Sequence, residues 1–103
     1  MLKLEIYIPC TYLDELREAL RFVGAGTSDA YDSVLSYSLV RGSWRALPGA
    51  NPYKGDIGKL CESDEYKVEV MCNEADLAKT ISVIKAIHPY ETPIINIIQL
   101  VRL

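Results

Sequence analysis

One pattern occurs twice in this chain, and it limits the folds that the chain can adopt. Residues 3–7 have the sequence KLEIY, and residues 67–71 have the sequence KVEVM. Apolar and polar side chains alternate in both segments, which predicts two half-buried strands. Each strand is followed by a cysteine (Cys10 or Cys72), a segment with helical apolar spacing and a further strand. This order predicts an α+β, ferredoxin-like (βαββαβ) fold, in which an antiparallel sheet carries both helices on one face.

Capping and breaking residues predict where these elements begin and end. Thr11 is the expected N-cap of the first helix, and Gly24 is placed to end that helix in a left-handed conformation. Asn73 is the expected cap of the second helix, which ends at His88 because Pro89 follows. The predicted strands cover residues 2–8, 34–40, 66–72 and 94–103, with a short return strand at 44–47 after a turn at 42–43.

The size and charge of the chain limit the classes of function open to it. The 103 residues correspond to a single domain, residues 1–103. Eleven basic and fourteen acidic residues give a net charge of −3, whereas nucleic-acid binding needs a basic surface. No stretch approaches the roughly 18 apolar residues of a membrane helix, and Glu5 interrupts the apolar run that a secretory signal needs. We therefore expect a cytoplasmic protein that binds neither nucleic acid nor membrane.

The last predicted strand is apolar on both faces. A sheet with helices on one side needs apolar residues on that side only. An exposed apolar face usually marks an interface, so we infer that a partner subunit covers the second face. The two faces of this strand consist of Ile94, Ile98 and Leu100 on one side and Ile95, Ile97 and Val101 on the other.

A long glycine-rich segment separates the two halves of the chain. Residues 42–58 contain four of the six glycines and two of the five prolines, which predicts an extra hairpin or a long loop at about 41–63. Glycine-rich backbone beside Arg45 and Lys54 could hold an anion. The alternative is a structural loop that wraps a neighbouring subunit.

A stiff connector between the second helix and the last strand carries several polar groups. His88, Tyr90 and Glu91 lie between or beside two prolines, Pro89 and Pro93, which restrict the backbone. We interpret this connector as a candidate ligand or metal corner with His88 and Glu91 as metal donors. The alternative is a rigid link whose histidine satisfies a helix C-terminus.

The cysteines offer a second candidate site. Cys10 and Cys72 each follow a strand and precede a helix, and we expect these two strands to lie side by side and parallel. They are a candidate redox pair or soft-metal site with lowered thiol pKa values. The alternative is two reduced, buried thiols in a reducing compartment.

Taken together, four segments resemble the inserted domain of the Nif-three-like family. These segments are Gly24-Ala25-Gly26, Tyr31-Asp32-Ser33, the 42–58 run and His88-Pro89-Tyr90-Glu91-x-Pro93. The resemblance implies a CutA-like and PII-like ferredoxin fold that forms homotrimers, here as a stand-alone version. It implies no dinuclear metal centre, since the family's metal ligands lie in flanking parts. Asp29, Val34 and Thr92 depart from the family pattern.

We expect a trimeric binding or regulatory module with a small ligand, or a divalent metal ion as cofactor, between subunits. His88, Tyr90 and Glu91 form the polar corner, over which Tyr31 and the 42–58 loop close. The remaining candidate ligand-binding residues are Trp44, Arg45, Asn51 and Tyr53. Two alternatives remain: a structural or protein-interaction domain without a ligand, and a small hydrolase, for which few titratable groups converge. No residue is assigned a catalytic role.

Overall fold

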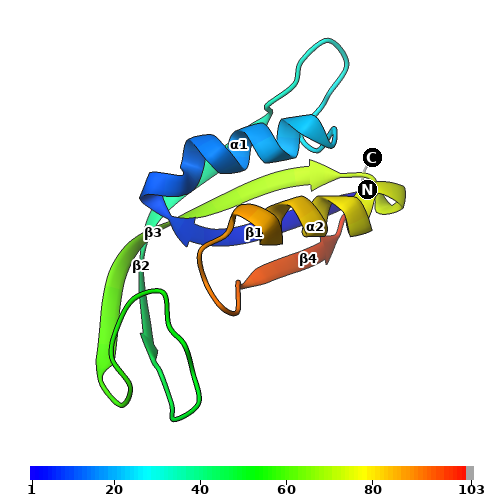
Figure 1. Cartoon of the computed structure of the whole chain (residues 1–103). Helices are drawn as coiled ribbons and strands as arrows, with labels where there is room; N and C mark the ends of the chain where they lie inside the picture. The colour runs from blue at the N-terminus through cyan, green and yellow to red at the C-terminus, as the bar shows by residue number, and fades with distance from the viewer. Residues whose placement is uncertain (102–103) are drawn as a thin grey trace.

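The structure, a computed structural model, describes residues 1–101 and contains one antiparallel sheet in the order β2-β3-β1-β4. Both helices cover the same face of this sheet (Figure 1). A single 3₁₀ turn precedes each helix, at Cys10–Tyr12 and at Glu74–Asp76. The elements are β1 (Leu2–Pro9), α1 (Leu13–Phe22), β2 (Leu35–Arg45), β3 (Leu60–Cys72), α2 (Leu77–Ile87) and β4 (Ile95–Gln99). The predicted ferredoxin-like fold is therefore confirmed.

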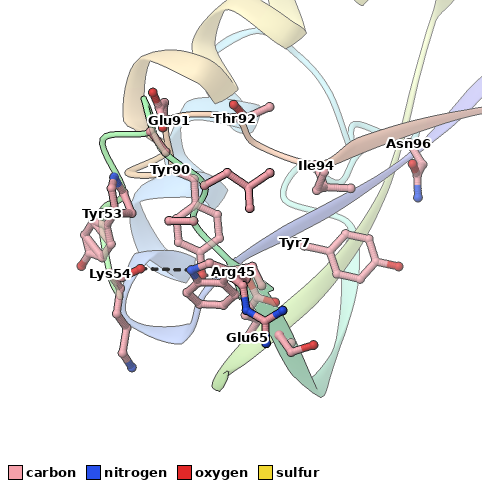
Figure 2. A pocket seen from close by; sticks show the side chains of 17 residues that line it. Tyr7, Arg45, Tyr53, Lys54, Glu65, Tyr90, Glu91, Thr92, Ile94 and Asn96 are labelled. Atoms are coloured by element: carbon pink, nitrogen blue, oxygen red, sulfur yellow. Dashed lines mark hydrogen bonds between the residues drawn. The ribbon is translucent and has the colours of Figure 1, made fainter. Parts of the chain in front are cut away.

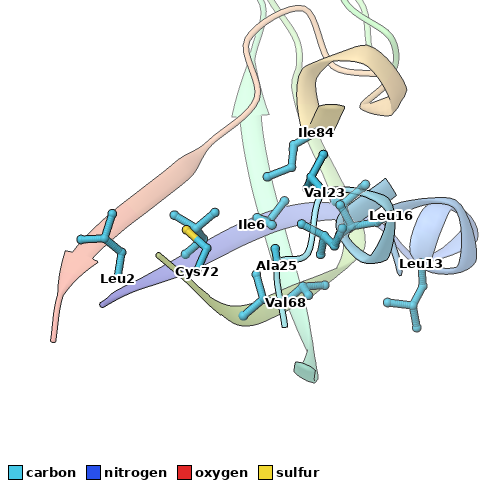
Figure 3. Packing of buried hydrophobic residues seen from close by; sticks show 13 residues of the cluster. Leu2, Ile6, Leu13, Leu16, Val23, Ala25, Val68, Cys72 and Ile84 are labelled. Carbon is cyan, nitrogen blue, oxygen red and sulfur yellow. The ribbon is translucent and has the colours of Figure 1, made fainter. Parts of the chain in front are cut away.

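The core lies between the sheet and the two helices (Figure 3). Alternation along β1 buries Leu2, Leu4, Ile6 and Ile8 against the helices, as the period of two predicts. Leu16 of α1 is fully buried among them, and complete burial of such a side chain stabilises the fold by roughly 1.5–3 kcal/mol. The opposite face of β1 is left to polar and aromatic side chains.

The ends of the helices agree with the sequence in part. Gly24 has φ +81° just after α1, which confirms the predicted left-handed termination. His88 is extended at the end of α2 (φ −72°, ψ 129°), as a residue before proline should be. Thr11 lies inside the first 3₁₀ turn, and neither Thr11 nor Asn73 makes the expected side-chain cap of a helix.

The predicted turn at residues 42–43 and the return strand at 44–47 are wrong. β2 continues through Gly42, which pairs with Ser63, to Arg45, which pairs with Leu60. Gly42 does not break the strand, because β3 pairs with β2 along this whole segment, as far as Leu60, the first residue of β3. The long arms of this hairpin extend beyond the helices, and the 46–59 loop folds back beside them (Figure 1). Of the two alternatives expected at about 41–63, the long loop is present, at residues 46–59, whereas residues 41–45 and 60–63 extend β2 and β3 instead of forming an extra hairpin.

The predicted pairing of Cys10 with Cys72 is also wrong. α1 returns the chain so that β2 runs in the direction of β1, and the hairpin then reverses it, so β3 is antiparallel to β1. Cys72 faces Leu2, whereas Cys10 follows the far end of β1. At 3.3 Å per residue, positions 2 and 10 are roughly 26 Å apart. Burial raises the pKa of both thiols, and Cys72 belongs to the core.

β4 is a short edge strand with exposed apolar side chains. Ile97 and Ile98 are 49% and 37% exposed and lie on opposite faces, as the sequence indicates, and Ile94, just before the strand, is 54% exposed. The predicted strand at 94–103 is shorter in the structure, and its positions 102–103 lie outside the described residues. Within residues 1–101, neither helix has the length and apolar character needed to cross a bilayer.

Candidate ligand-binding site

A cavity of about 640 Å³ lies where the β2–β3 hairpin, its loop and the connector after α2 meet (Figure 2). Its sheet residues, such as Tyr7 and Glu65, alternate with core residues, so the cavity opens on the face that the helices leave uncovered. The lining consists of Tyr7, Gly42, Ser43, Trp44, Arg45, Ala46, Leu47, Ala50, Pro52, Tyr53, Lys54, Glu65, Tyr90, Glu91, Thr92, Ile94 and Asn96.

A buried carboxylate forms part of the cavity wall. Glu65 on β3 is 6% exposed, and its Oε2 accepts a hydrogen bond of 2.8 Å from the Tyr90 hydroxyl. Its Oε1 occupies the space beside Gly42, where the Cβ of any other residue would overlap it. Burial, followed by this hydrogen bond and the nearby charge of Glu65, raises the pKa of Tyr90 far above its ordinary value. Tyr90 therefore acts as a neutral hydrogen-bond donor.

Three aromatic rings from different segments gather around this carboxylate. The ring of Tyr90 lies 5.6 Å from that of Trp44 and 5.9 Å from that of Tyr53, measured between centroids. The Trp44 indole N–H donates to the Lys54 carbonyl oxygen at 3.0 Å, as the dashed line in Figure 2 shows. The end of β2, the loop and the connector are thereby held together by aromatic contacts.

His88 lies behind Tyr90 and fastens the connector to β1. Its Nε2–H donates to the Tyr7 carbonyl oxygen at 2.7 Å, and its Nδ1 accepts the Tyr90 N–H at 3.2 Å. The side chain is 7% exposed, and burial lowers the pKa of His88, against smaller raising effects from the Tyr7 bond and Glu65. A buried, neutral imidazole with both nitrogens bonded is a structural link.

These contacts do not favour the expected metal corner. Either nitrogen of His88 would have to give up a backbone hydrogen bond to bind a metal ion, and a side-chain oxygen of Glu91 accepts the Asn51 N–H at 3.0 Å. Within the described part of the chain, no group of three or more His, Cys, Asp or Glu side chains could hold a metal ion. The Asn51–Glu91 bond instead ties the 46–59 loop to the connector.

The structure brings together most of the predicted ligand-binding residues and separates one. Trp44, Arg45, Tyr53, Tyr90 and Glu91 line the cavity, whereas His88 and Asn51 support it from behind. The exception is the side chain expected to close over the site. Tyr31 is 72% exposed and lies in the loop between α1 and β2, outside the cavity lining of its own subunit. Its expected role at a cleft between subunits stays a prediction.

Sequence reasoning missed Glu65, and it missed the contact of Glu65 with Gly42, which was expected in a turn of the 42–58 run and not in a strand. The available signal was the alternation of β3, which places Glu65 on the uncovered face. Its neighbour across the sheet could be identified only with the register of β2 on β3, in which Gly42 pairs with Ser63.

Solved structures place this fold in a known class. CutA1 from Pyrococcus horikoshii superposes with a TM-score of 0.72 at 16% identity, covering 100% of this chain and 86% of that chain. The PII-like protein CutA from Nostoc sp. PCC 7120 gives 0.71 at 14% identity, covering 97% and 81%. At these identities the likeness shows the fold alone. The chain therefore has the fold of the CutA and PII-like proteins.

Sequence comparison identifies the relatives more closely. A Bacillus cereus protein related to NIF3 superposes with a TM-score of 0.83 at 25% identity, covering 96% of this chain and 25% of that chain. A GTP cyclohydrolase 1 type 2 homolog of Halalkalibacterium halodurans is 34% identical over 91 residues, 88% of this chain and 24% of the relative. A Staphylococcus aureus homolog is 31% identical over 98 residues, 95% of this chain and 27% of the relative.

The chain is thus related to the Nif-three-like proteins over nearly its whole length. It spans about a quarter of the length of the curated relatives that it matches. No family model matches the chain.

Proposed function

We propose that this domain is a small-molecule-binding or regulatory module whose ligand occupies the aromatic cavity. The cavity itself carries the proposal. Its volume of about 640 Å³ lies within the range of roughly 300–1,000 Å³ that ligand pockets occupy. Its walls combine aromatic rings with a few placed polar groups, Glu65 and Tyr90 among them. This composition is typical of sites for small organic molecules.

We propose further that the module works as a homotrimer with the cavity beside a subunit interface. The resemblance to CutA and PII-like proteins supports this assembly, and so do the exposed apolar residues of β4. Ile94 belongs both to that exposed region and to the cavity lining. A second subunit packed on β4 would therefore adjoin the opening of the cavity.

The proposal concerns binding and not the reaction to which the relatives' name refers. About three quarters of each of those relatives lies outside the matched segment. We place the domain in the cytoplasm, which is supported by three free cysteines and the absence of a disulfide among residues 1–101.

A fluorescence screen tests the proposed binding. Trp44 is the single tryptophan of the chain and lines the cavity, so its emission reports directly on occupancy. We expect members of a panel of small metabolites to change this emission saturably and to raise the melting temperature. Tyr53→Ala should weaken the response, because Tyr53 lines the cavity.

Tyr31→Ala is the matched control, since it removes the same side chain from an exposed position outside the cavity. It should leave the binding response unchanged. A panel that changes neither the emission nor the melting temperature would contradict the proposal, and so would equal effects of the two variants.

A further inference from the structure

Accepting the proposed function, on which this inference rests, we infer that the ligand is a small planar nitrogen base. Amidines, guanidines and amino-substituted heterocycles form this class. Their N–H groups would donate to the Glu65 carboxylate while the ring or plane lies against the aromatic walls.

Glu65 is a buried carboxylate of the sheet without a cationic partner, whereas Glu62, which also forms no ion pair among residues 1–101, is exposed. Glu5 lies within 4 Å of Lys3 and Lys67, Glu69 pairs with Lys3, and Asp64 pairs with Arg41. Glu65 is the most buried carboxylate of the sheet, yet no Lys, Arg or His of residues 1–101 forms an ion pair with it. A buried carboxylate without a counter-charge is costly, so a cationic donor that enters the cavity would stabilise it.

The carboxylate keeps free acceptor capacity toward the cavity. Oε2 receives one hydrogen bond from Tyr90, and within residues 1–101 Oε1 receives none. Two carboxylate oxygens offer about four acceptor positions. The missing Cβ of Gly42 leaves the space in which Oε1 lies, and both residues line the cavity. Planar groups with two parallel N–H donors pair with carboxylates through two hydrogen bonds, one to each oxygen.

The surrounding rings favour a planar and positively charged partner. The ring centroid of Tyr90 lies within 6 Å of those of Trp44 and Tyr53, and the faces of such rings attract cations. Two cations of the chain also line the cavity. Lys54 donates to Ser63 at 3.1 Å, and Arg45 is exposed, so water screens its charge. Neither neutralises Glu65, and the buried anion dominates the interior.

Three isosteric probes test this inference through the emission of Trp44. Benzamidine carries a planar cationic amidine, benzamide its neutral counterpart and benzoate an anion. We expect benzamidine to bind the unaltered protein at least tenfold more tightly than benzamide or benzoate. This comparison needs no variant. Equal affinity of the three probes, or no binding of benzamidine, would overturn the inference.

Two variants with the same change in charge then locate the contact. Glu65→Gln should weaken benzamidine binding at least tenfold, whereas Asp64→Asn on the adjacent, exposed position should leave it unchanged. Circular dichroism checks that both variants are folded. Equal benzamidine affinity of the two variants would overturn the inference.

The results separate this inference from the proposed function. Binding of benzamide, or of a metabolite from the panel, that depends on Tyr53 but not on Glu65 would retain the cavity and reject the nitrogen base. Absence of any binding would reject both. A third outcome is that the unaltered protein binds no benzamidine and that Glu65→Gln, but not Asp64→Asn, lowers the oligomer mass. This outcome would assign the counter-charge of Glu65 to a second copy of the chain and would also overturn the inference.

Discussion

The single histidine predicts how the stability of this domain depends on pH. His88 is buried, and its two ring nitrogens bond to the backbone of Tyr7 and Tyr90. Protonation would convert Nδ1 from an acceptor into a donor that faces the Tyr90 N–H. Burial also disfavours the charged ring, so the pKa of His88 is lowered from its ordinary value of 6.5. Acid should therefore weaken the connection between the second helix and β1.

The sign and the limit of this effect follow from proton linkage. Between the lowered folded pKa and 6.5, the unfolded chain binds more protons than the folded chain, so the free energy of unfolding rises with pH. The contribution of His88 is complete above about pH 6.5 and is lost as the pH falls toward the folded pKa. One titrating group limits the slope to about 1.4 kcal/mol per pH unit. Glu5 and Glu18, whose pKa values are lowered below 4.5, titrate outside this range.

Urea denaturation followed by Trp44 emission between pH 5 and pH 8 measures this slope. Since the chain has one histidine, His88→Gln should remove the pH dependence between pH 5 and pH 6.5. The variant should also lose stability at pH 8, because each buried backbone group left without a partner costs about 1–3 kcal/mol. Identical slopes in the two proteins would refute the assignment, as would a stability that rises when the pH falls from 6.5 to 5.

Three further predictions concern the cavity, the core and the assembly. Gly42→Ala should displace the Glu65 carboxylate and break its hydrogen bond to Tyr90, which should lower the free energy of unfolding in urea by about 1–3 kcal/mol. Tyr90→Phe added to this variant should lower it little further, and full additivity of the two changes would contradict the contact. Leu16→Asp places a charge at a fully buried position and should cost more than about 4 kcal/mol, whereas Phe22→Asp, at a position 82% exposed on the same helix, should change the melting temperature little. Ile97→Lys on the exposed part of β4 should lower the oligomer mass in light scattering without unfolding the subunit, and an unchanged mass would show that β4 lies outside the interface.

The fold could be predicted because its information is local. The period of two in residues 2–8 and the helical spacing of Leu13, Leu16 and Leu20 correspond directly to the buried residues of β1 and α1. The order of elements then leaves few ways to bury these faces. The prediction of a turn at residues 42–43 was wrong because a glycine can continue a strand when a neighbouring strand supplies its hydrogen-bonding partners.

The site could be predicted only in part, because it depends on register and direction between distant segments. Trp44, Tyr53 and Tyr90 belong to the two segments in which the sequence predicts ligand-binding residues, and they do line the cavity. The contact of Glu65 with Gly42 requires the register of β2 on β3, which no spacing in the sequence gives. The separation of Cys10 from Cys72 likewise depends on strand direction.

Nuclear magnetic resonance of the labelled protein during a benzamidine titration tests the central claim most directly. We predict saturable shifts of the Trp44 indole N–H, which bonds to Lys54, and of the backbone amides of Gly42 and Tyr90 beside Glu65. The amide of Tyr31, outside the cavity lining, should not move. Shifts confined to other regions, or no shifts at saturating benzamidine, would contradict a cavity built to hold a nitrogen base.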